Sequence, residues 1–230
     1  MTVLHLADDG EAADLAAFLS RLLHYDRSAA VRLQAAGTAL AVFGRPPSFE
    51  VLAIRAVRLA KPYEDGLDVT LDVTVSAGEL LESVDERAAT AAVPKAVTGP
   101  PWAGVLPPRA GWQAEPGLPA PAALRALVAA AVGEFRSRTE ELAPDGRTRA
   151  ELDRIGRDIW SRTVGGTPLP VRAVHAAQSL GFLRPVAPAA AGATDEAVLL
   201  SAGPWLRLRT PFGSIAVRRA GLGTLGVSVR

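Results

Sequence analysis

The chain has 230 residues, enough for one large domain or two small ones. Of these, 49% are apolar and 21% are charged, which favours a packed core and excludes wholesale disorder. The formal net charge is +1 and cysteine is absent, so the composition indicates no strong overall attraction to polyanions. It also excludes disulfides, thiolate metal sites and cysteine nucleophiles.

The first residues include acidic Asp8 and Asp9 and no positively charged stretch, so we expect no secretory signal. No run of about 18 apolar residues lacks a charge, so we expect no membrane contact and a cytoplasmic location. Asparagine is absent and the only lysines are Lys61 and Lys95. Such usage is typical of a GC-rich genome, so arginine content alone does not indicate a function.

The first sixty residues predict a strand, a helix and then more strands. Residues 3–6 predict a short strand, and Asp9 is expected to cap an amphipathic helix. Apolar runs at 31–35 and 39–43 predict a hairpin, and residues 51–59 predict a further strand.

Residues 67–76 alternate strictly between apolar and polar side chains, as in an antiparallel strand with one buried face. Ser76 and Glu79 then form a capping box, which starts a short helix that we expect to extend through Val84. Together these patterns predict an antiparallel α+β domain over residues 1–93.

Residues 94–121 hold eight of the 18 prolines and are predicted to be a linker between domains. Tandem prolines favour an extended conformation that docks at low entropic cost, so Trp102 and Trp112 are candidates for binding a protein partner. The alternative is that both indoles pin the linker onto its own domains.

The remaining residues, 122–230, are predicted to form a three-helix domain that ends in a hairpin. Apolar residues at helical spacing follow Pro121, a capping box at Thr148 opens a second helix, and a third is expected over 170–180. After an Ala/Pro/Gly loop at 185–194, two β-rich runs flank a turn at 211–213, which predicts the hairpin.

By element order, residues 121–219 resemble a winged helix-turn-helix. The resemblance implies that residues 171–180 are a recognition helix, residues 205–219 the wing, and double-stranded DNA the partner. The chain departs from that pattern in two ways. The third helix offers only Arg172 and His175 as polar readers, and the turn of the hairpin is short.

Several motifs carry no prediction. The G-x-G-x-x-G match at 221–226 is followed by only four residues, so no helix can receive a pyrophosphate there. His5, His24 and His175 lack metal-ligand spacing, and no cofactor or metal is expected. Asp68 and Asp72 are interpreted as the solvated face of a strand.

The hairpin predicts the best candidate surface. Trp205, Arg207 and Arg209 alternate onto one face, and either Arg218 or Arg219 must join them from the return strand. Guanidinium groups beside an indole suit phosphate pairing and base stacking. The alternative is that these arginines only cover the outside of a half-buried sheet.

Charge is distributed unevenly along the chain. Residues 1–110 carry a net charge of −4, residues 111–230 a net charge of +5, and residues 147–230 alone a net charge of +7. An acidic first half and a basic second half are typical of a protein whose C-terminal domain faces nucleic acid.

The sequence therefore predicts a non-enzymatic DNA-binding or DNA-associated protein. Its predicted contacts are Arg172, Trp205, Arg207, Arg209, Arg218 and Arg219. A second hypothesis is an interaction or scaffold module that uses Trp102 and Trp112. A third is an enzyme whose site lies between the domains and includes His175 and carboxylates.

Overall fold

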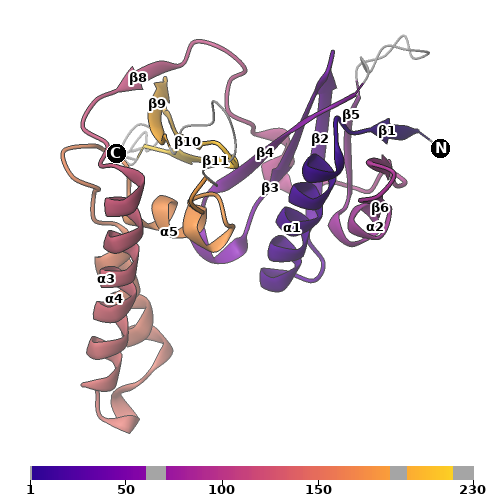
Figure 1. Ribbon diagram of the computed structural model, residues 1–230. Coiled ribbons are helices and arrows are strands. Elements are labelled where there is room, and N and C mark those ends of the chain that lie inside the picture. The colour runs from indigo at the N-terminus through magenta and orange to yellow at the C-terminus, as the bar shows by residue number, and fades with distance from the viewer. Residues whose placement is uncertain (1, 61–70, 187–195, 220–230) are drawn as a thin grey trace, which may run out of the picture.

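The computed structural model describes residues 2–60, 71–186 and 196–219. The expected strand residues 67–70, most of the loop at 185–194 and the glycine motif at 221–226 lie outside the described residues. The described chain consists of antiparallel sheets and a few helices, so the mixed α+β class is confirmed (Figure 1).

The strands are, in chain order, β1 (Val3–His5), β2 (Ala30–Ala36), β3 (Ala39–Gly44), β4 (Leu52–Arg58), β5 (Asp72–Ser76), β6 (Val84–Asp85), β7 (Thr90–Ala92), β8 (Gln113–Glu115), β9 (Val198–Ala202), β10 (Trp205–Thr210) and β11 (Gly213–Arg218). The α-helices are α1 (Asp9–Tyr25), α2 (Ala77–Glu82), α3 (Pro121–Glu140), α4 (Arg149–Trp160) and α5 (Val171–Ser179). Short 3-10 helices are η1 (Pro47–Phe49), η2 (Pro101–Gly104) and η3 (Pro144–Gly146).

Both predicted hydroxyl caps form at the N-termini of their helices. The Ser76 hydroxyl accepts a hydrogen bond from the Glu79 amide at the start of α2, and Thr148 accepts one from Glu151 at the start of α4. Each bond satisfies an amide that has no partner inside the helix, which is why these residues determine where the helices begin.

Two helix boundaries differ from those expected. Asp8 is the cap of α1, because its carboxylate accepts from the Glu11 amide at 2.8 Å, and Asp9 is the first helical residue. Helix α2 ends at Glu82, so Val84 lies in β6 and not in the helix. A short sheet of order β1-β7-β6 competes with the helix for these residues.

A single eight-stranded sheet includes strands from both halves of the described chain. Its order is β5-β2-β3-β4-β11-β10-β9-β8, and every neighbouring pair is antiparallel. The pairing of β4 with β11 joins the halves, with Leu52 opposite Ala216 and Ile54 opposite Ser214. The segment predicted as a linker contributes the edge strand β8.

The predicted hairpin is present as β10 and β11, but it lies inside the sheet. Strand β10 also pairs with β9, and β11 also pairs with β4, so neither strand of the hairpin has a free edge along these pairings. A wing that reaches into DNA would have free edges, and here the sheet occupies them.

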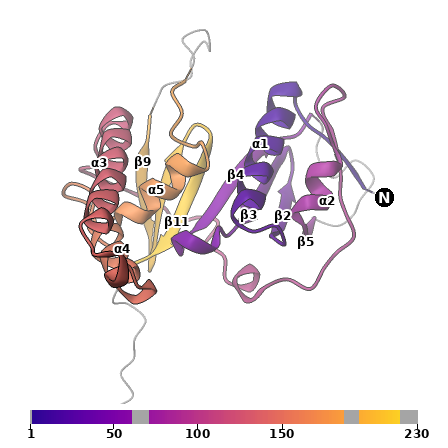
Figure 2. The same cartoon turned by 90° about the horizontal axis from the view of Figure 1, so that it is seen from below.

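Helices α1 and α5 lie on the same side of the sheet (Figures 1 and 2). The main hydrophobic cluster on this side contains Phe18 and Leu33 from the first half and Val174 and Leu206 from the second. The two halves therefore share one core, and burial of its apolar side chains favours their association.

The opposite face of the sheet holds a second, smaller cluster of buried residues: Phe43, Leu52, Ile54 and Ala216. Trp102 and Leu106 pack against it from the proline-rich chain, and we call residues 94–112 the strap. The strap is hydrogen-bonded to the sheet, because Arg32 donates to the Ala103 carbonyl at 2.6 Å.

A buried arginine connects α1 to the second half of the chain. Arg55 on β4 lies 2.9 Å from Glu11 and 3.2 Å from Asp14, both on α1, and it donates to the Phe212 carbonyl at 2.9 Å. Asp14 also pairs with Arg184 at 2.6 Å. These contacts satisfy charges that would be costly to bury alone.

Helices α3 and α4 lie side by side and extend beyond the sheet (Figure 1). Leu124 and Val128 of α3 are buried, whereas the more distal Val132 and Phe135 are only partly covered. Within the described part of the chain, no helix has the length and apolar character needed to span a bilayer.

Candidate functional site

A pocket lies at the end of the sheet where β4 and β10 begin and β11 ends. Its volume is about 370 Å³. The lining comes from five segments: the η1 turn, the start of β4, the strap, the first turn of α5, and the β10–β11 hairpin. The residues that line it are Arg45, Glu50, Val51, Leu52, Pro101, Trp102, Val105, Arg172, Trp205, Ala216, Val217 and Arg218.

The local sequence explains why charged side chains gather there. Pro46 and Pro47 set the turn η1 between β3 and β4, which leaves Arg45 before it and Glu50 after it. Glu50 has a left-handed backbone with φ of 53°, a conformation that costs energy for a residue with a side chain. Pro170 precedes α5, so Arg172 falls in the first turn of that helix.

Two tryptophans form aromatic walls of the pocket. Trp205 lies directly opposite Arg218 in the hairpin, and opposite residues of an antiparallel pair have side chains on the same face. The Arg218 guanidinium carbon is 5.2 Å from the centre of the Trp205 ring, within the range of a cation–π contact. Trp102 comes from η2 in the strap.

Positive charge in the pocket is incompletely balanced. Among the described residues, no carboxylate lies within 4.0 Å of Arg45 or Arg218. Arg172 Nε is 3.9 Å from a Glu50 oxygen, which is too long for a hydrogen bond, and this buried atom has no hydrogen-bond partner in the described chain. Of the three guanidinium groups, only that of Arg172 therefore lies near a carboxylate, the exposed Glu50.

Arg207 and Arg209 continue the same face along β10, beyond the pocket. Arg207 lies opposite Ala216 and Arg209 opposite Ser214, and Arg209 is exposed. Burial lowers the pKa of Arg207 and repulsion from Arg209 lowers it further, although an arginine remains charged at neutral pH. The Arg207 guanidinium carbon is 5.8 Å from the ring centre of Trp112.

Four of the residues predicted from the sequence meet in this pocket: Arg172, Trp205, Arg218 and Trp102. Trp205 was expected to share a face with either Arg218 or Arg219, and Arg218 is the one that does. Arg172 was predicted as a further contact of the same surface. The approach of Trp102 was not expected, because it belongs to a segment far from the others in the sequence. Two roles had been considered for Trp102, namely binding a separate partner and pinning the linker onto its own domains; its packing on the second cluster agrees with the latter.

Arg219 does not join the other arginines. Its guanidinium pairs with Glu115 of β8 at 2.6 Å, because a residue next to Arg218 must point to the other face of the hairpin. Trp112 donates from its indole nitrogen to the Pro108 carbonyl at 2.9 Å, a contact inside the strap.

His175 is not available as a polar reader on α5. Its ring stacks on Trp160 at 4.5 Å and meets the edge of Phe49 at 5.1 Å. Burial lowers the pKa of this imidazole, so the neutral form is favoured in the folded protein. Among the described residues no group of three His, Cys, Asp or Glu side chains is placed to hold a metal ion.

Arg45 and Glu50 were missed because each is an unremarkable charged residue in a turn. The signal that could have found them is the sequence Gly-Arg-Pro-Pro-Ser-Phe-Glu at 44–50, in which two prolines hold two charges in place between strands. Only pairing of β4 with β11 brings that turn beside the hairpin.

Two protein families match the chain, and the boundary between the two matches falls inside the strap. Residues 1–104 match a domain of unknown function (DUF8010), and residues 107–222 match a second domain of unknown function (DUF8185). No curated protein matches the chain. Both matched regions line the pocket, the first through Arg45 and Trp102 and the second through Arg172 and Trp205. The chain therefore belongs to the DUF8185 family, whose model covers just over half of its length.

Proposed function

We propose that the chain binds DNA through the face formed by Trp205, Arg207, Arg209 and Arg218, which we call the basic face. The observation that carries the proposal is the register of the hairpin. It places these four side chains on one side of β10 and β11, next to a pocket that contains two further arginines.

The charges of the basic face support contact with phosphate. Arg207, Arg209 and Arg218 have no carboxylate within 4.0 Å among the described residues, so an anion would not have to displace an internal partner. Arginine guanidinium groups bind phosphate in a bidentate manner. The basic second half of the chain would add attraction at longer range.

The proposed contact differs from insertion of a recognition helix. Buried positions of α5 include Val171, Ala173, Val174, Ala176 and Ala177, which leaves Arg172 as its one cationic contribution. The likeness to a winged helix is therefore limited to the order of the elements. The binding surface is the sheet face, and the phosphate backbone is its target.

Binding of a labelled oligonucleotide, as duplex and as single strand, at about 50 and 200 mM salt tests the proposal. Removing two phosphate contacts with Arg207→Ala/Arg209→Ala should lower the slope of log affinity against log salt by about 2. A matched control is Arg136→Ala/Arg157→Ala, which removes two exposed charges on α3 and α4. No binding, or equal loss in both double variants, would refute the proposal.

A second candidate is a protein-binding function of the strap. Val97 and Val105 are 41% and 49% exposed, and both lie in this segment. A partner captured through this segment should be lost in Val97→Asp while oligonucleotide affinity stays unchanged, because Val97 does not line the pocket.

A further inference from the structure

The lining of the pocket separates into an apolar part and a charged part. Trp102 and Trp205 provide indole rings, and Leu52, Pro101 and Val105 provide further apolar surface. Arg45, Arg172 and Arg218 provide positive charge. A ligand that satisfies both parts has a flat apolar body and an anionic group.

A phosphate is the anionic group that best fits the charged part of the lining. Arg172 lies in the first turn of α5, where no acidic residue offsets the positive end of the helix dipole. Its Nε has no hydrogen-bond partner in the described chain, and Glu50 is too distant to provide one. A phosphate has several acceptor oxygens and so can bind more than one guanidinium at once.

A nucleobase is the flat group that best fits the apolar part of the lining. Bases stack on tryptophan whatever their identity, and Trp205 already has a guanidinium beside it. Glu50 is the one carboxylate among the lining residues, and it would accept a hydrogen bond from the amino group of a base.

We infer that this pocket holds one unstacked nucleotide of a single strand, with its base against Trp102 and Trp205 and its phosphate among Arg45, Arg172 and Arg218. This inference rests on the proposed function. The volume of about 370 Å³ is that of a small-molecule site. A paired base remains stacked inside a duplex and cannot enter such a site without being flipped out.

The basic face then guides the neighbouring nucleotides. Trp205, Arg207 and Arg209 are alternate residues of β10, spaced by roughly 7 Å along the strand. The row begins at the pocket and runs away from it, so each guanidinium can meet a different phosphate. Single-stranded nucleic acid can follow this row while one base enters the pocket.

The test compares a labelled 12-nucleotide single strand with its duplex, and follows tryptophan fluorescence as well as anisotropy. The variant is Arg45→Gln, because Arg45 is exposed and makes no hydrogen bond or ion pair in the described chain, so the fold should be retained. Arg136→Gln on α3 is the matched control. We expect the single strand to bind more tightly than the duplex, with quenching of tryptophan fluorescence.

Loss of one charge-assisted contact should weaken single-strand binding roughly tenfold in Arg45→Gln and leave duplex binding and the Arg136→Gln control unchanged. A free nucleoside 5′-monophosphate should quench the same fluorescence and compete with the strand. If the monophosphate does not compete with the strand, the inference that the pocket holds a nucleotide of the strand is overturned. Equal binding of both forms without an effect of Arg45→Gln would also overturn it.

These outcomes differ from failure of the proposed function. If the oligonucleotides bind and depend on Arg207 and Arg209 but not on Arg45, the basic face binds nucleic acid and the pocket does not hold a base. If neither oligonucleotide binds, the proposed function and the inference both fall.

Discussion

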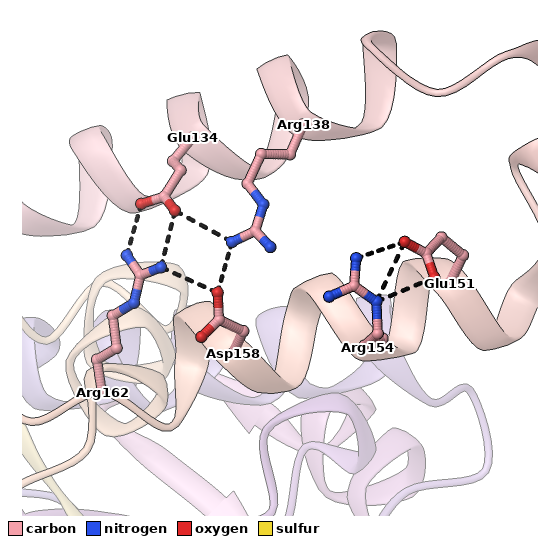
Figure 3. Close-up of polar contacts among 6 residues, drawn as sticks. All are labelled: Glu134, Arg138, Glu151, Arg154, Asp158 and Arg162. Atoms are coloured by element: carbon pink, nitrogen blue, oxygen red, sulfur yellow. Dashed lines mark hydrogen bonds and ion pairs between the residues drawn. The ribbon is translucent and has the colours of Figure 1, made fainter.

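Arginines perform two different tasks in this protein. On the arm formed by α3 and α4, Arg138 and Arg162 share the carboxylates of Glu134 and Asp158, and the four side chains connect the two helices (Figure 3). At the pocket and on the basic face, Arg45, Arg209 and Arg218 have no such partners among the described residues.

The difference shows that the arginine content of the chain cannot be interpreted as a whole. The paired arginines are neutralised by the carboxylates that they share, so they leave little net charge for a ligand. On the basic face, burial lowers the pKa of Arg207, and repulsion from Arg209 lowers it further. Such an arrangement persists because the surrounding sheet and core stabilise it, and an anion would relieve it.

The largest effect on stability is expected at the buried paired arginine. Arg55→Ala leaves Asp14 and Glu11 with fewer partners in a buried place, and we expect a loss of about 3 kcal/mol in the free energy of unfolding. The control is Arg45→Ala at the pocket, with a change within about 0.5 kcal/mol. Urea denaturation measures both, and equal losses would contradict the comparison.

The next effect is expected at the wall of the pocket. Trp102 packs on the second cluster but is only partly buried, so Trp102→Ala should cost about 2 kcal/mol, less than a fully buried tryptophan. Trp112→Ala should cost less, because Trp112 is not part of either hydrophobic cluster and is held by a hydrogen bond to Pro108 and a contact with Arg207. An unchanged melting temperature in Trp102→Ala would instead favour the hypothesis that this residue binds a partner.

A smaller effect is expected on the pH dependence of stability, through the titration of His175. Its pKa is lowered in the folded state, so the unfolded chain binds more protons and stability falls as the pH drops below about 6.5. His175→Phe keeps the aromatic stack on Trp160 and removes the titration. Thermal melts between about pH 7.5 and 5 should show the loss in the wild type and a flatter profile in the variant.

The smallest effect is expected in the exposed network of the helical arm. Hydrogen bonds from Arg162 and Arg138 lower the pKa values of Glu134 and Asp158. Their stabilising contribution is present above the unfolded pKa values of about 4 and is lost as the pH falls through the lower, folded values. Arg138→Gln/Arg162→Gln should therefore reduce the acid sensitivity of unfolding below about pH 4, as followed by circular dichroism.

Local patterns predicted the individual elements well. Apolar runs placed the hairpin β2–β3, capping signals placed α2 and α4, proline and glycine signals placed α5, and two β-rich runs placed the hairpin β10–β11, all within a few residues of their observed bounds. These features depend on short-range geometry, such as a hydroxyl that caps an amide three residues ahead. The error at Asp9 arose because two consecutive aspartates can each serve as a cap.

The candidate site was predicted in part. Period-two alternation placed Trp205, Arg207 and Arg209 on one face, and showed that only one of Arg218 and Arg219 could join them. It could not show that Glu115 would take Arg219, or that Trp102 would approach Trp205, because those contacts join residues about a hundred positions apart.

The sequence by itself determined the mixed α+β class, the capped starts of α2 and α4 and the face of the last hairpin, since each follows from spacing along a few residues. Only the tertiary structure decided that both halves share one sheet and one core, because strand pairing between β4 and β11 depends on burial summed over both halves. The same pairing decided that a proline-bounded turn, the strap, α5 and the hairpin enclose one pocket.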